Sequence, residues 1–437
     1  MDLLEKLRSR QARIAVIGLG YVGLPLAVEK ARAGFHVVGI DSNPDRVKMV
    51  NQGRNYIGDV VPEDLAAVTG EGHLTATSTF EPVADADVVT ICVPTPLDRH
   101  KQPDTSYIED VVEASLPYLH EGQLVVLEST TYPGTTEEII RPRVESLGLK
   151  VGEDIFVAFS PERVDPGNAR YKTRNTPKVV GGITPRCAEM AKALYENTLS
   201  AGVHTVSSTK AAEMTKLLEN VFRAVNVSLV NELAMLCERM GVDIWEVIEA
   251  ASTKPFGYMP FYPGPGLGGH CIPLDPFYLS WKAKEYGFTT RFIELAGEIN
   301  ETMPGHVVER TMELVNDRGI ALRGARILLV GVAYKKDIDD LRESPAIKIA
   351  KLLLKHGAEL SYHDPHVPSV QIDQNELRSI ELAPESLASF DLVLITTAHS
   401  AVDYEEIVRH AENVLDTRNA TEGLVAENLH RLGAMTP

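Results

Sequence analysis

The feature that most constrains this chain is a glycine-rich turn between two apolar runs near its N-terminus. The first run covers residues 14–17, the turn reads Gly18-Leu-Gly20-Tyr-Val-Gly23, and a helical pattern leads to the second run at 35–40. A strand, a tight turn, a helix and a second strand in this order are typical of a βαβ unit and hence of a parallel sheet. Asp41 ends the second run, 18 residues after Gly23. An acidic residue at this distance completes the fingerprint of a dinucleotide-binding turn.

The same turn indicates which dinucleotide would bind. Glycines let the backbone approach a pyrophosphate, whose charge is favoured at a helix N-terminus. Asp41 would accept hydrogen bonds from the ribose hydroxyls and repel a 2′-phosphate, so NAD is favoured over NADP. A tight turn without a ligand would also use glycines, but the spacing disfavours it. The cofactor contacts predicted in and after this turn are Gly18, Gly20, Tyr21, Val22, Gly23, Asp41 and Arg46.

Alternating strand and helix patterns predict an α/β fold with two sheet-containing regions. Apolar runs at 88–93, 124–129 and 155–160, then a helix near 185–196 and a strand near 203–206, continue the first sheet. A second αβ region begins at residue 326, and it lacks a GxGxxG turn. We therefore expect two Rossmann-like, doubly wound, mostly parallel domains, of which only the first binds a dinucleotide.

A long helix is predicted between the two regions. Residues 208–240 contain neither proline nor glycine, Ser207 or Ser208 can cap the start, and Gly241 can end it. A helix of about 32 residues is roughly 48 Å long, which suits a spine between domains and a dimer interface. The predicted domains are 1–206, 207–305 and 306–437, and the predicted assembly is a homodimer or higher homo-oligomer through this helix.

Composition limits the partners and the compartment. The chain has 43 Lys and Arg against 61 Asp and Glu, a net charge of −18, which argues against nonspecific binding to nucleic acid or an anionic membrane. No signal peptide or membrane span is expected, because there is no apolar leader and no apolar run of about 18 residues. Four widely spaced cysteines are typical of reduced thiols in a cytoplasmic protein without a disulfide framework or a zinc site.

Two motifs in the middle of the chain offer reactive groups. Lys216 and Asn220 lie one helical turn apart, so together they can stabilise an alkoxide or oxyanion, unless they simply face solvent. Cys271 lies in a loop at 254–277 rich in proline, glycine and aromatic residues, and Asp275 follows it as a candidate base or water-positioning group. A thiolate beside a nicotinamide can capture an aldehyde and carry it to a thioester, although a buried structural cysteine would also fit this loop.

Polar residues that follow predicted strands are further candidates. Ser129, Thr130 and Glu162 come after strand-like runs, where ligands bind in open α/β sheets, although ordinary helix capping would also explain the hydroxyls. Lys335 and Arg342 form a local basic pair after a strand in the second region. They are a candidate anion clamp or, alternatively, part of a solvated loop.

Together, these motifs resemble those of the nucleotide-sugar 6-dehydrogenases, the UDP-glucose/GDP-mannose dehydrogenase family. The resemblance covers nearly the whole chain through GLGYVGLP, CVPTP, ESTTYPGTTEE, SPER, EMTKLLEN, GPGLGGHCIPLDP and GVAYKKDIDDLRESPA. It implies an NAD domain, a dimer-forming central helix and a C-terminal domain that binds the UDP-sugar. It also implies a cytoplasmic enzyme that removes four electrons from C6 of the sugar and so oxidises it to a uronate. Uronates of this kind are used in polysaccharide biosynthesis.

The resemblance also implies roles for individual residues. Cys271 resembles the nucleophile, and Lys216 and Asn220 resemble the pair that stabilises alkoxide and oxyanion states. Asp275, Thr130 and Glu162 resemble the groups that position the hydrolytic water and transfer its protons. Further cofactor contacts are expected from Pro94, Thr95, Ser129, Thr130 and Arg342. Substrate contacts are expected from Glu162, Arg163, Val164, Lys216, Asn220, Tyr262, Gly268 and Lys335.

Departures from the UDP-glucose pattern indicate the sugar. That branch usually reads C-x-P-K-D-T, where this chain has Leu274 and Pro276, and usually has a glutamate where this chain has Pro166. Loss of a lysine and a carboxylate suits an uncharged acetamido group, which favours UDP-N-acetylglucosamine over UDP-glucose. UDP-N-acetylmannosamine differs from it only at C2 and stays open as an alternative. Two competing hypotheses are a two-electron dehydrogenase of the β-hydroxyacid type and a non-catalytic nucleotide-binding regulator.

Overall fold

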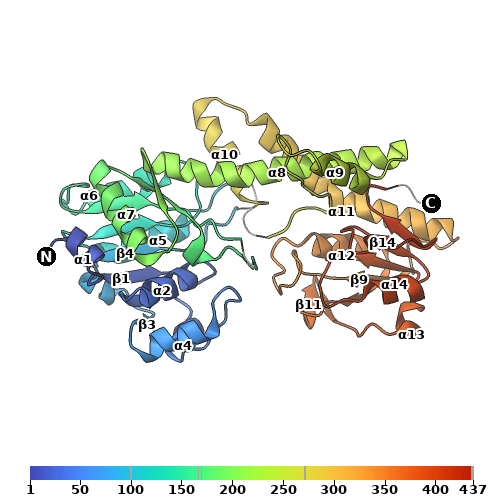
Figure 1. Ribbon diagram of the computed structural model, residues 1–437, viewed down its shortest axis with the longest axis horizontal. Helices are drawn as coiled ribbons and strands as arrows, with labels where there is room; N and C mark the ends of the chain where they lie inside the picture. The colour runs from blue at the N-terminus through green and yellow to red at the C-terminus, as the bar shows by residue number, and fades with distance from the viewer. Residues whose placement is uncertain (99–100, 166, 169, 270–271, 435–437) are drawn as a thin grey trace. The chain divides into compact units, whose positions relative to one another are not determined.

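The computed structural model describes residues 1–98, 101–165, 167–168, 170–269 and 272–434. The chain forms two compact units (Figure 1). Unit 1 contains Met1–Glu219 and Phe277–Phe288, and unit 2 contains Asn220–Pro276 and Thr289–Pro437. The division falls inside two helices, α8 (Thr209–Met240) and α10 (Asp275–Ala283).

Unit 1 is built on a sheet of eight strands in the order β3-β2-β1-β4-β5-β6-β7-β8. The strands are β1 (Arg13–Ile17), β2 (His36–Ile40), β3 (Leu74–Thr77), β4 (Val88–Ile91), β5 (Leu124–Leu127), β6 (Phe156–Phe159), β7 (Lys178–Gly182) and β8 (Val203–Val206). Its helices are α1 (Leu3–Arg8), α2 (Gly23–Arg32), α3 (Pro44–Asn51), α4 (Pro62–Gly70), α5 (Ser106–Ser115), α6 (Arg141–Glu145) and α7 (Pro185–Thr198). Strands β1 to β6 are parallel, whereas β7 pairs antiparallel with β6 and β8 follows β7.

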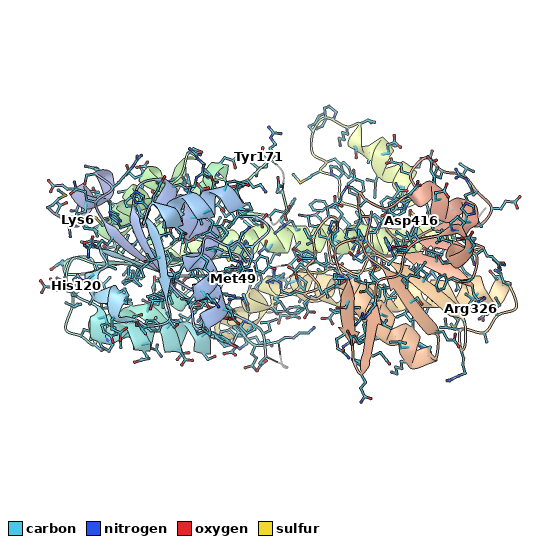
Figure 2. The ribbon with its side chains drawn as sticks, turned by 90° about the horizontal axis from the view of Figure 1, so that it is seen from below. Lys6, Met49, His120, Tyr171, Arg326 and Asp416 are labelled. Atoms are coloured by element: carbon cyan, nitrogen blue, oxygen red, sulfur yellow. The ribbon has the colours of Figure 1, made fainter. Side chains whose placement is uncertain are left out.

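The parallel strands of unit 1 give the sheet an amino edge and a carboxyl edge. Strands β4, β5 and β6 are buried along their whole length, as expected for parallel strands covered on both faces. In Figure 2, Lys6 and His120 mark the end of unit 1 where these strands begin. The loops that follow the strands gather at the opposite, carboxyl edge, where ligands bind in doubly wound sheets.

Unit 2 contains a parallel sheet in the order β10-β9-β13-β14-β15 and a hairpin of β11 and β12. The strands are β9 (Arg326–Val330), β10 (Glu359–His363), β11 (Ser369–Ile372), β12 (Asn375–Arg378), β13 (Leu392–Ile395), β14 (Val414–Asp416) and β15 (Leu429–Arg431). Its helices, apart from the parts of α8 and α10, are α9 (Ile244–Ser252), α11 (Arg291–Asp317), α12 (Pro345–His356), α13 (Pro384–Leu387) and α14 (Tyr404–His410). In Figure 2, Arg326 opens β9 and Asp416 closes β14.

Strand β9 shows why this sheet is covered on both faces. Ile327 and Leu329 belong to one buried apolar cluster, whereas Leu328 and Val330 belong to another. Because successive side chains point to opposite faces of a sheet, both faces must be packed against other elements. The α/β class with two Rossmann-like parts is therefore confirmed.

The predicted long helix and its ends are found where the sequence placed them. Helix α8 spans Thr209–Met240, the Ser208 hydroxyl accepts a hydrogen bond from the Ala211 amide, and Gly241 has a φ of +71°. The loop predicted to reach residue 277 ends earlier, because α10 begins at Asp275. No helix among the described residues has both the length and the apolar character needed to span a bilayer.

Candidate active site

The glycine-rich turn leaves room for a phosphate at one particular position. A Cβ on Gly18, which has a φ of +89°, would lie 2.5 Å from the carbonyl oxygen of Cys92. A Cβ on Gly23 would lie 1.7 Å from the carbonyl oxygen of Gly18. These two glycines are therefore needed for packing, whereas no atom lies within 4 Å of a Cβ built on Gly20. The open space at Gly20, beside the start of α2, fits the approach of a pyrophosphate to the backbone.

Asp41 is fixed at the end of β2 by backbone amides. One carboxylate oxygen accepts from the Leu19 amide at 2.8 Å, and the other accepts from the Asn43 amide at 2.8 Å. The Arg46 guanidinium lies 3.4 Å from the carboxylate, which is 6% exposed. A carboxylate has about four acceptor positions, so Asp41 keeps the capacity to bind ribose hydroxyls. The residues present therefore fit NAD.

The loops after β4 and β5 are linked by side-chain hydrogen bonds. The Thr95 hydroxyl donates to the Thr130 carbonyl at 2.6 Å, and the Ser129 hydroxyl donates to the Val93 carbonyl at 2.7 Å. The Tyr278 hydroxyl donates to the Thr95 carbonyl from 183 residues away in the sequence. The structure thus brings Thr95, Ser129 and Thr130 together at the carboxyl edge. The sequence did not indicate this contact of Tyr278, because the two residues are so far apart in the chain.

Glu162 follows β6 and is held at both carboxylate oxygens. One oxygen accepts from the amides of Arg163 at 2.7 Å and Val164 at 2.9 Å, and the other lies 3.3 Å from the Lys178 ammonium. Burial opposes ionisation, but Lys178, these amides and the Lys216 ammonium together hold the pKa of Glu162 below its usual value. Glu162 is therefore a carboxylate at neutral pH.

Lys216 is a buried cation beside this carboxylate. Its residue is 6% exposed, and its ammonium has no hydrogen-bond or ion-pair partner among the described parts of the chain. A buried charge without a partner is costly. An electron-rich oxygen of a bound ligand would stabilise this cation. The predicted role of Lys216 in holding an alkoxide or oxyanion stays a prediction.

Arg163 is more strongly tied to the protein than the sequence indicated. Its guanidinium donates to the Glu219 carboxylate at 2.6 and 2.9 Å and to the Pro177 carbonyl at 2.8 Å. The side chain therefore connects the loop after β6 to α8. Its backbone amide belongs to the cradle of Glu162.

Unit 2 contributes a separate group of predicted residues. The Asn220 amide nitrogen donates to the Asp275 carboxylate, although the two residues lie 55 positions apart. The Asn220 oxygen accepts from the Arg223 guanidinium at 2.5 Å. Both Asn220 and Asp275 are buried. The i, i+4 spacing located Asn220, but its pairing with Asp275 required the tertiary fold.

The glycine-rich segment before Cys271 packs on the loop after β9. A Cβ on Gly268 would lie 2.5 Å from the Cβ of Tyr334, so a side chain there would displace that loop. The Gly269 amide donates to the Arg342 carbonyl at 2.9 Å. This contact places Gly268 and Gly269 beside the segment that carries Lys335 and Arg342. Cys271 itself lies outside the described residues, so its role stays a prediction.

Two other predicted ligand contacts are engaged within unit 2. The Arg342 guanidinium pairs with the Asp340 carboxylate at 2.6 Å. Tyr262 is 57% exposed and stacks on Trp245 with ring centres 6.2 Å apart. Neither contact removes the residue from solvent, and neither tests the predicted ligand.

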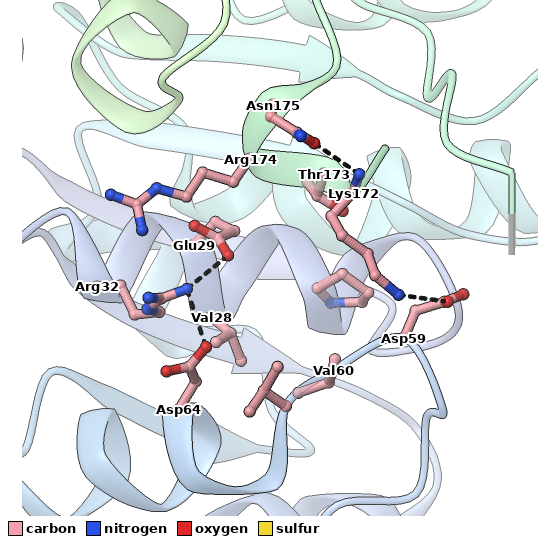
Figure 3. Close-up of a pocket in the computed structure, with 12 residues that line it drawn as sticks. Val28, Glu29, Arg32, Asp59, Val60, Asp64, Lys172, Thr173, Arg174 and Asn175 are labelled. Atoms are coloured by element: carbon pink, nitrogen blue, oxygen red, sulfur yellow. Dashed lines mark hydrogen bonds and ion pairs between the residues drawn. The ribbon is translucent and has the colours of Figure 1, made fainter. Parts of the chain in front are cut away.

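A cavity of about 290 Å³ in unit 1 is lined by none of these residues (Figure 3). It is lined by α2, α4 and the segment 172–175, and Arg32 pairs there with both Glu29 and Asp64 at 2.9 Å. On its other side, Lys172 faces Asp59 at 3.9 Å. These charges largely satisfy one another, so the cavity is poorly suited to a nucleotide diphosphate.

Comparison with known proteins identifies a family for most of the chain. Residues 12–199 match the NAD binding domain of the UDP-glucose/GDP-mannose dehydrogenase family. Residues 210–302 match its central domain, and residues 328–423 match its UDP binding domain. The chain belongs to the UDP-glucose/GDP-mannose dehydrogenase family. It is therefore a nucleotide-sugar dehydrogenase that uses NAD, and its substrate is a UDP-sugar.

Members of this family with different named substrates resemble the chain to similar degrees. A UDP-N-acetyl-D-glucosamine 6-dehydrogenase of Pseudomonas aeruginosa is 37% identical over 90% of this chain and 91% of its own. An NDP-N-acetyl-D-galactosaminuronic acid dehydrogenase of Ralstonia nicotianae is 38% identical over 93% and 95%. The structure of a UDP-D-ManNAc dehydrogenase from Pyrococcus horikoshii has a TM-score of 0.88, with 34% identity over 96% and 99%. Overall likeness does not separate these sugars.

Proposed function

We propose that this family member oxidises C6 of a UDP-N-acetylhexosamine, foremost UDP-N-acetylglucosamine, to the uronate through a cysteine thioester. The observation that carries the proposal is the buried ammonium of Lys216, which lacks a partner within the described part of the chain and lies beside the ionised Glu162. Such a cation suits an alkoxide or oxyanion, and an adjacent carboxylate suits a proton from water.

The reaction divides into four balanced steps. Loss of hydride from C6 and of the hydroxyl proton gives an aldehyde, to which the Cys271 thiolate adds. Loss of a second hydride from this thiohemiacetal gives a thioester. Water then attacks the thioester carbon, the C–S bond breaks, and the thiol and the uronate are released. NAD, when bound, accepts the hydrides, so two NADH accompany each uronate.

We assign individual roles from the family resemblance and from the spacing of the residues. Lys216 and Asn220 stabilise the alkoxide of the first step and the oxyanion of the last, being one turn apart on α8. Thr130, Glu162 and Asp275 orient the water and accept its proton. The domains we assign to these tasks are 1–206 for NAD, 207–305 for the cysteine loop and 306–437 for the UDP-sugar.

The choice of sugar rests on three positions near the motifs. Leu274 and Pro276 stand where the UDP-glucose pattern has lysine and threonine, and Pro166 stands where that pattern has a glutamate. A pocket with fewer charges suits an acetamido group at C2. UDP-N-acetylmannosamine and UDP-glucose are the alternative substrates, and the same assay distinguishes them.

Formation of NADH with UDP-N-acetylglucosamine, UDP-N-acetylmannosamine and UDP-glucose tests the proposal. We expect two NADH per uronate, kcat/KM largest for UDP-N-acetylglucosamine, and no uronate from Cys271→Ala. Cys237→Ala, which alters a free thiol in α8, is the matched control and should retain activity. Activity restricted to UDP-glucose would refute the assigned sugar, and one NADH per substrate would favour a two-electron dehydrogenase.

We also propose that the chain forms a homodimer through the central helix. In unit 2, α8 exposes an apolar stripe of Phe222, Leu229, Leu233, Leu236 and Met240. Helix α11 exposes Phe292, at 78%, and Leu295. An exposed apolar stripe along a helix is typical of an interface between subunits.

A further inference from the structure

Reversal of β7 brings one lysine to the carboxyl edge of the sheet. Strand β7 pairs antiparallel with β6, with Phe159 opposite Gly181 and Ala158 opposite Gly182. Continuing this register sets residue 162 opposite residue 178. Lys178, the first residue of β7, therefore lies where β5 and β6 end and where Glu128 and Glu162 begin the following loops.

Each donor position of Lys178 has an acceptor. The ammonium lies 2.6 Å from a Glu128 oxygen, 3.0 Å from the Pro161 carbonyl and 3.3 Å from a Glu162 oxygen. A lysine ammonium has three N–H groups, so this set is complete. The side chain is only 3% exposed, which keeps water from competing for these bonds.

A fixed carboxylate stands on the other side of Lys178. The Glu128 side chain is 0% exposed, and its second oxygen accepts from the hydroxyl of Tyr195, a residue of α7. Burial disfavours a charged lysine, but the two carboxylates outweigh it and raise the pKa of Lys178. Lys178 is thus a stable cation that lies between two carboxylates. The Glu128 side chain is fully buried, whereas that of Glu162 is 14% exposed.

We propose that Lys178 is a positioning residue that holds Glu162 ionised and fixed for the water step of the reaction. The inference rests on the proposed function. In that step the water oxygen bonds to the thioester carbon, one water proton passes to Glu162, and the thiolate leaves. Two amides and one ammonium hold both oxygens of Glu162, so its orientation is set before substrate arrives.

Other charged groups around Glu162 determine the sign of each test. Lys216 on α8 favours its ionised form, as Lys178 does. Glu128 shares the Lys178 ammonium with Glu162, and a second carboxylate so close disfavours ionisation of Glu162 by like-charge repulsion. Lys30 on α2 and Cys92 after β4 also interact with Glu162 electrostatically. Removing Lys178 therefore raises the pKa of Glu162, and neutralising Glu128 lowers it.

The experiment is the pH profile of kcat, measured as NADH formation by the full-length protein with the best UDP-sugar. For Lys178→Met we expect kcat to fall on the order of 100-fold at pH 7 while KM changes less than about threefold. The acid limb should move up by at least about one pH unit, and Lys178→Arg should restore it. Glu128→Gln should move the limb in the opposite direction.

Controls separate positioning from folding. Lys178→Met leaves two carboxylates without their cation, so the double variant with Glu128→Gln provides a folded alternative. Its acid limb should lie above that of Glu128→Gln alone, because the two proteins differ only at residue 178. Lys282→Met removes a buried lysine from between Glu138 and Glu285 and should leave the limb in place.

Two results would overturn the assignment in different ways. A folded Lys178→Met enzyme with the wild-type limb and kcat, or a folded double variant with the limb and kcat of Glu128→Gln, would refute the role of Lys178 alone. Absence of NADH from the wild-type protein with every UDP-sugar would refute the proposed function and, with it, this step.

Discussion

Two glycines of the cofactor turn, Gly20 and Gly23, are expected to respond very differently to the same added methyl group. Gly20 is open, and its backbone is not left-handed, so Gly20→Ala should change the free energy of unfolding by no more than about 1 kcal/mol. Gly23→Ala would push Cβ to 1.7 Å from the Gly18 carbonyl oxygen, a backbone atom that no rotamer change can move away. We expect it to destabilise the protein by about 1–3 kcal/mol or more.

For the affinity for NAD, Gly20→Ala should be the more damaging of the two substitutions. A methyl group at Gly20 occupies the space that the pyrophosphate needs, so we expect at least tenfold weaker binding, or about 1.4 kcal/mol. At one hundred times the wild-type Kd, NAD adds about 2.7 kcal/mol of stability, and tenfold weaker binding leaves about 1.4 kcal/mol. Urea unfolding with and without NAD measures both quantities in one assay.

Gly72→Ala is the matched control, because a Cβ there also meets no atom within 4 Å but lies far along the chain from the turn. Its left-handed φ of +76° adds backbone strain, so only its response to NAD serves for comparison. If Gly20→Ala kept the full stabilisation by NAD, the pyrophosphate would not lie against this turn, and the reasoning would be wrong.

Three further predictions concern stability and assembly. Glu213→Gln should cost about 1–3 kcal/mol in urea unfolding, because the buried carboxylate accepts from the amide and hydroxyl of Thr136 and from the Gly134 amide. Burial opposes ionisation of Asp364, but hydrogen bonds from His399 and from backbone amides lower its pKa to about 2. Its stabilisation is complete above the unfolded pKa of about 3.9, so the advantage over Asp364→Asn should shrink by roughly 1–2 kcal/mol, after solvent screening, as urea unfolding is repeated from pH 5 to pH 2. Leu233→Glu should halve the mass measured by light scattering, since it puts a charge in the apolar stripe of α8.

Each of these has an outcome that would contradict it. An unchanged urea midpoint for Glu213→Gln would mean that the loop after Tyr132 is held by other contacts. A constant gap between wild type and Asp364→Asn from pH 5 to pH 2 would contradict the lowered pKa. A folded Leu233→Glu protein with the wild-type mass would remove α8 from the interface.

Local patterns were sufficient wherever the decisive contacts are close in sequence. The GxGxxG turn predicted β1, α2 and β2, and the run without proline or glycine predicted α8 to within a residue. The short strand β3, the reversed strand β7 and the hairpin of β11 and β12 were not predicted. Strand β3 has a mixed burial pattern, and β12 is largely exposed, so neither has the continuous apolar run that indicates a covered strand.

The candidate site divides in the same way. Motifs predicted Glu162, Lys216, Asn220 and Asp275, because family resemblance and helix spacing can be recognised from the residue types alone. They did not locate Tyr278 or Tyr195, whose hydroxyls reach partners 183 and 67 positions away. Tyr195 belongs to no motif. Tyr278 lies at the end of the glycine-rich motif, but nothing in that pattern pointed to its partner.

By itself, the sequence determined the NAD-binding turn, the α/β class, the long helix and the family, since each depends on residue type and short-range spacing. Only the tertiary structure decided that Lys178 stands between Glu128 and Glu162 and that Asn220 holds Asp275. The physical reason is that strand direction and side-chain pairing across a fold depend on packing between distant segments. A residue's neighbours in sequence do not report these contacts.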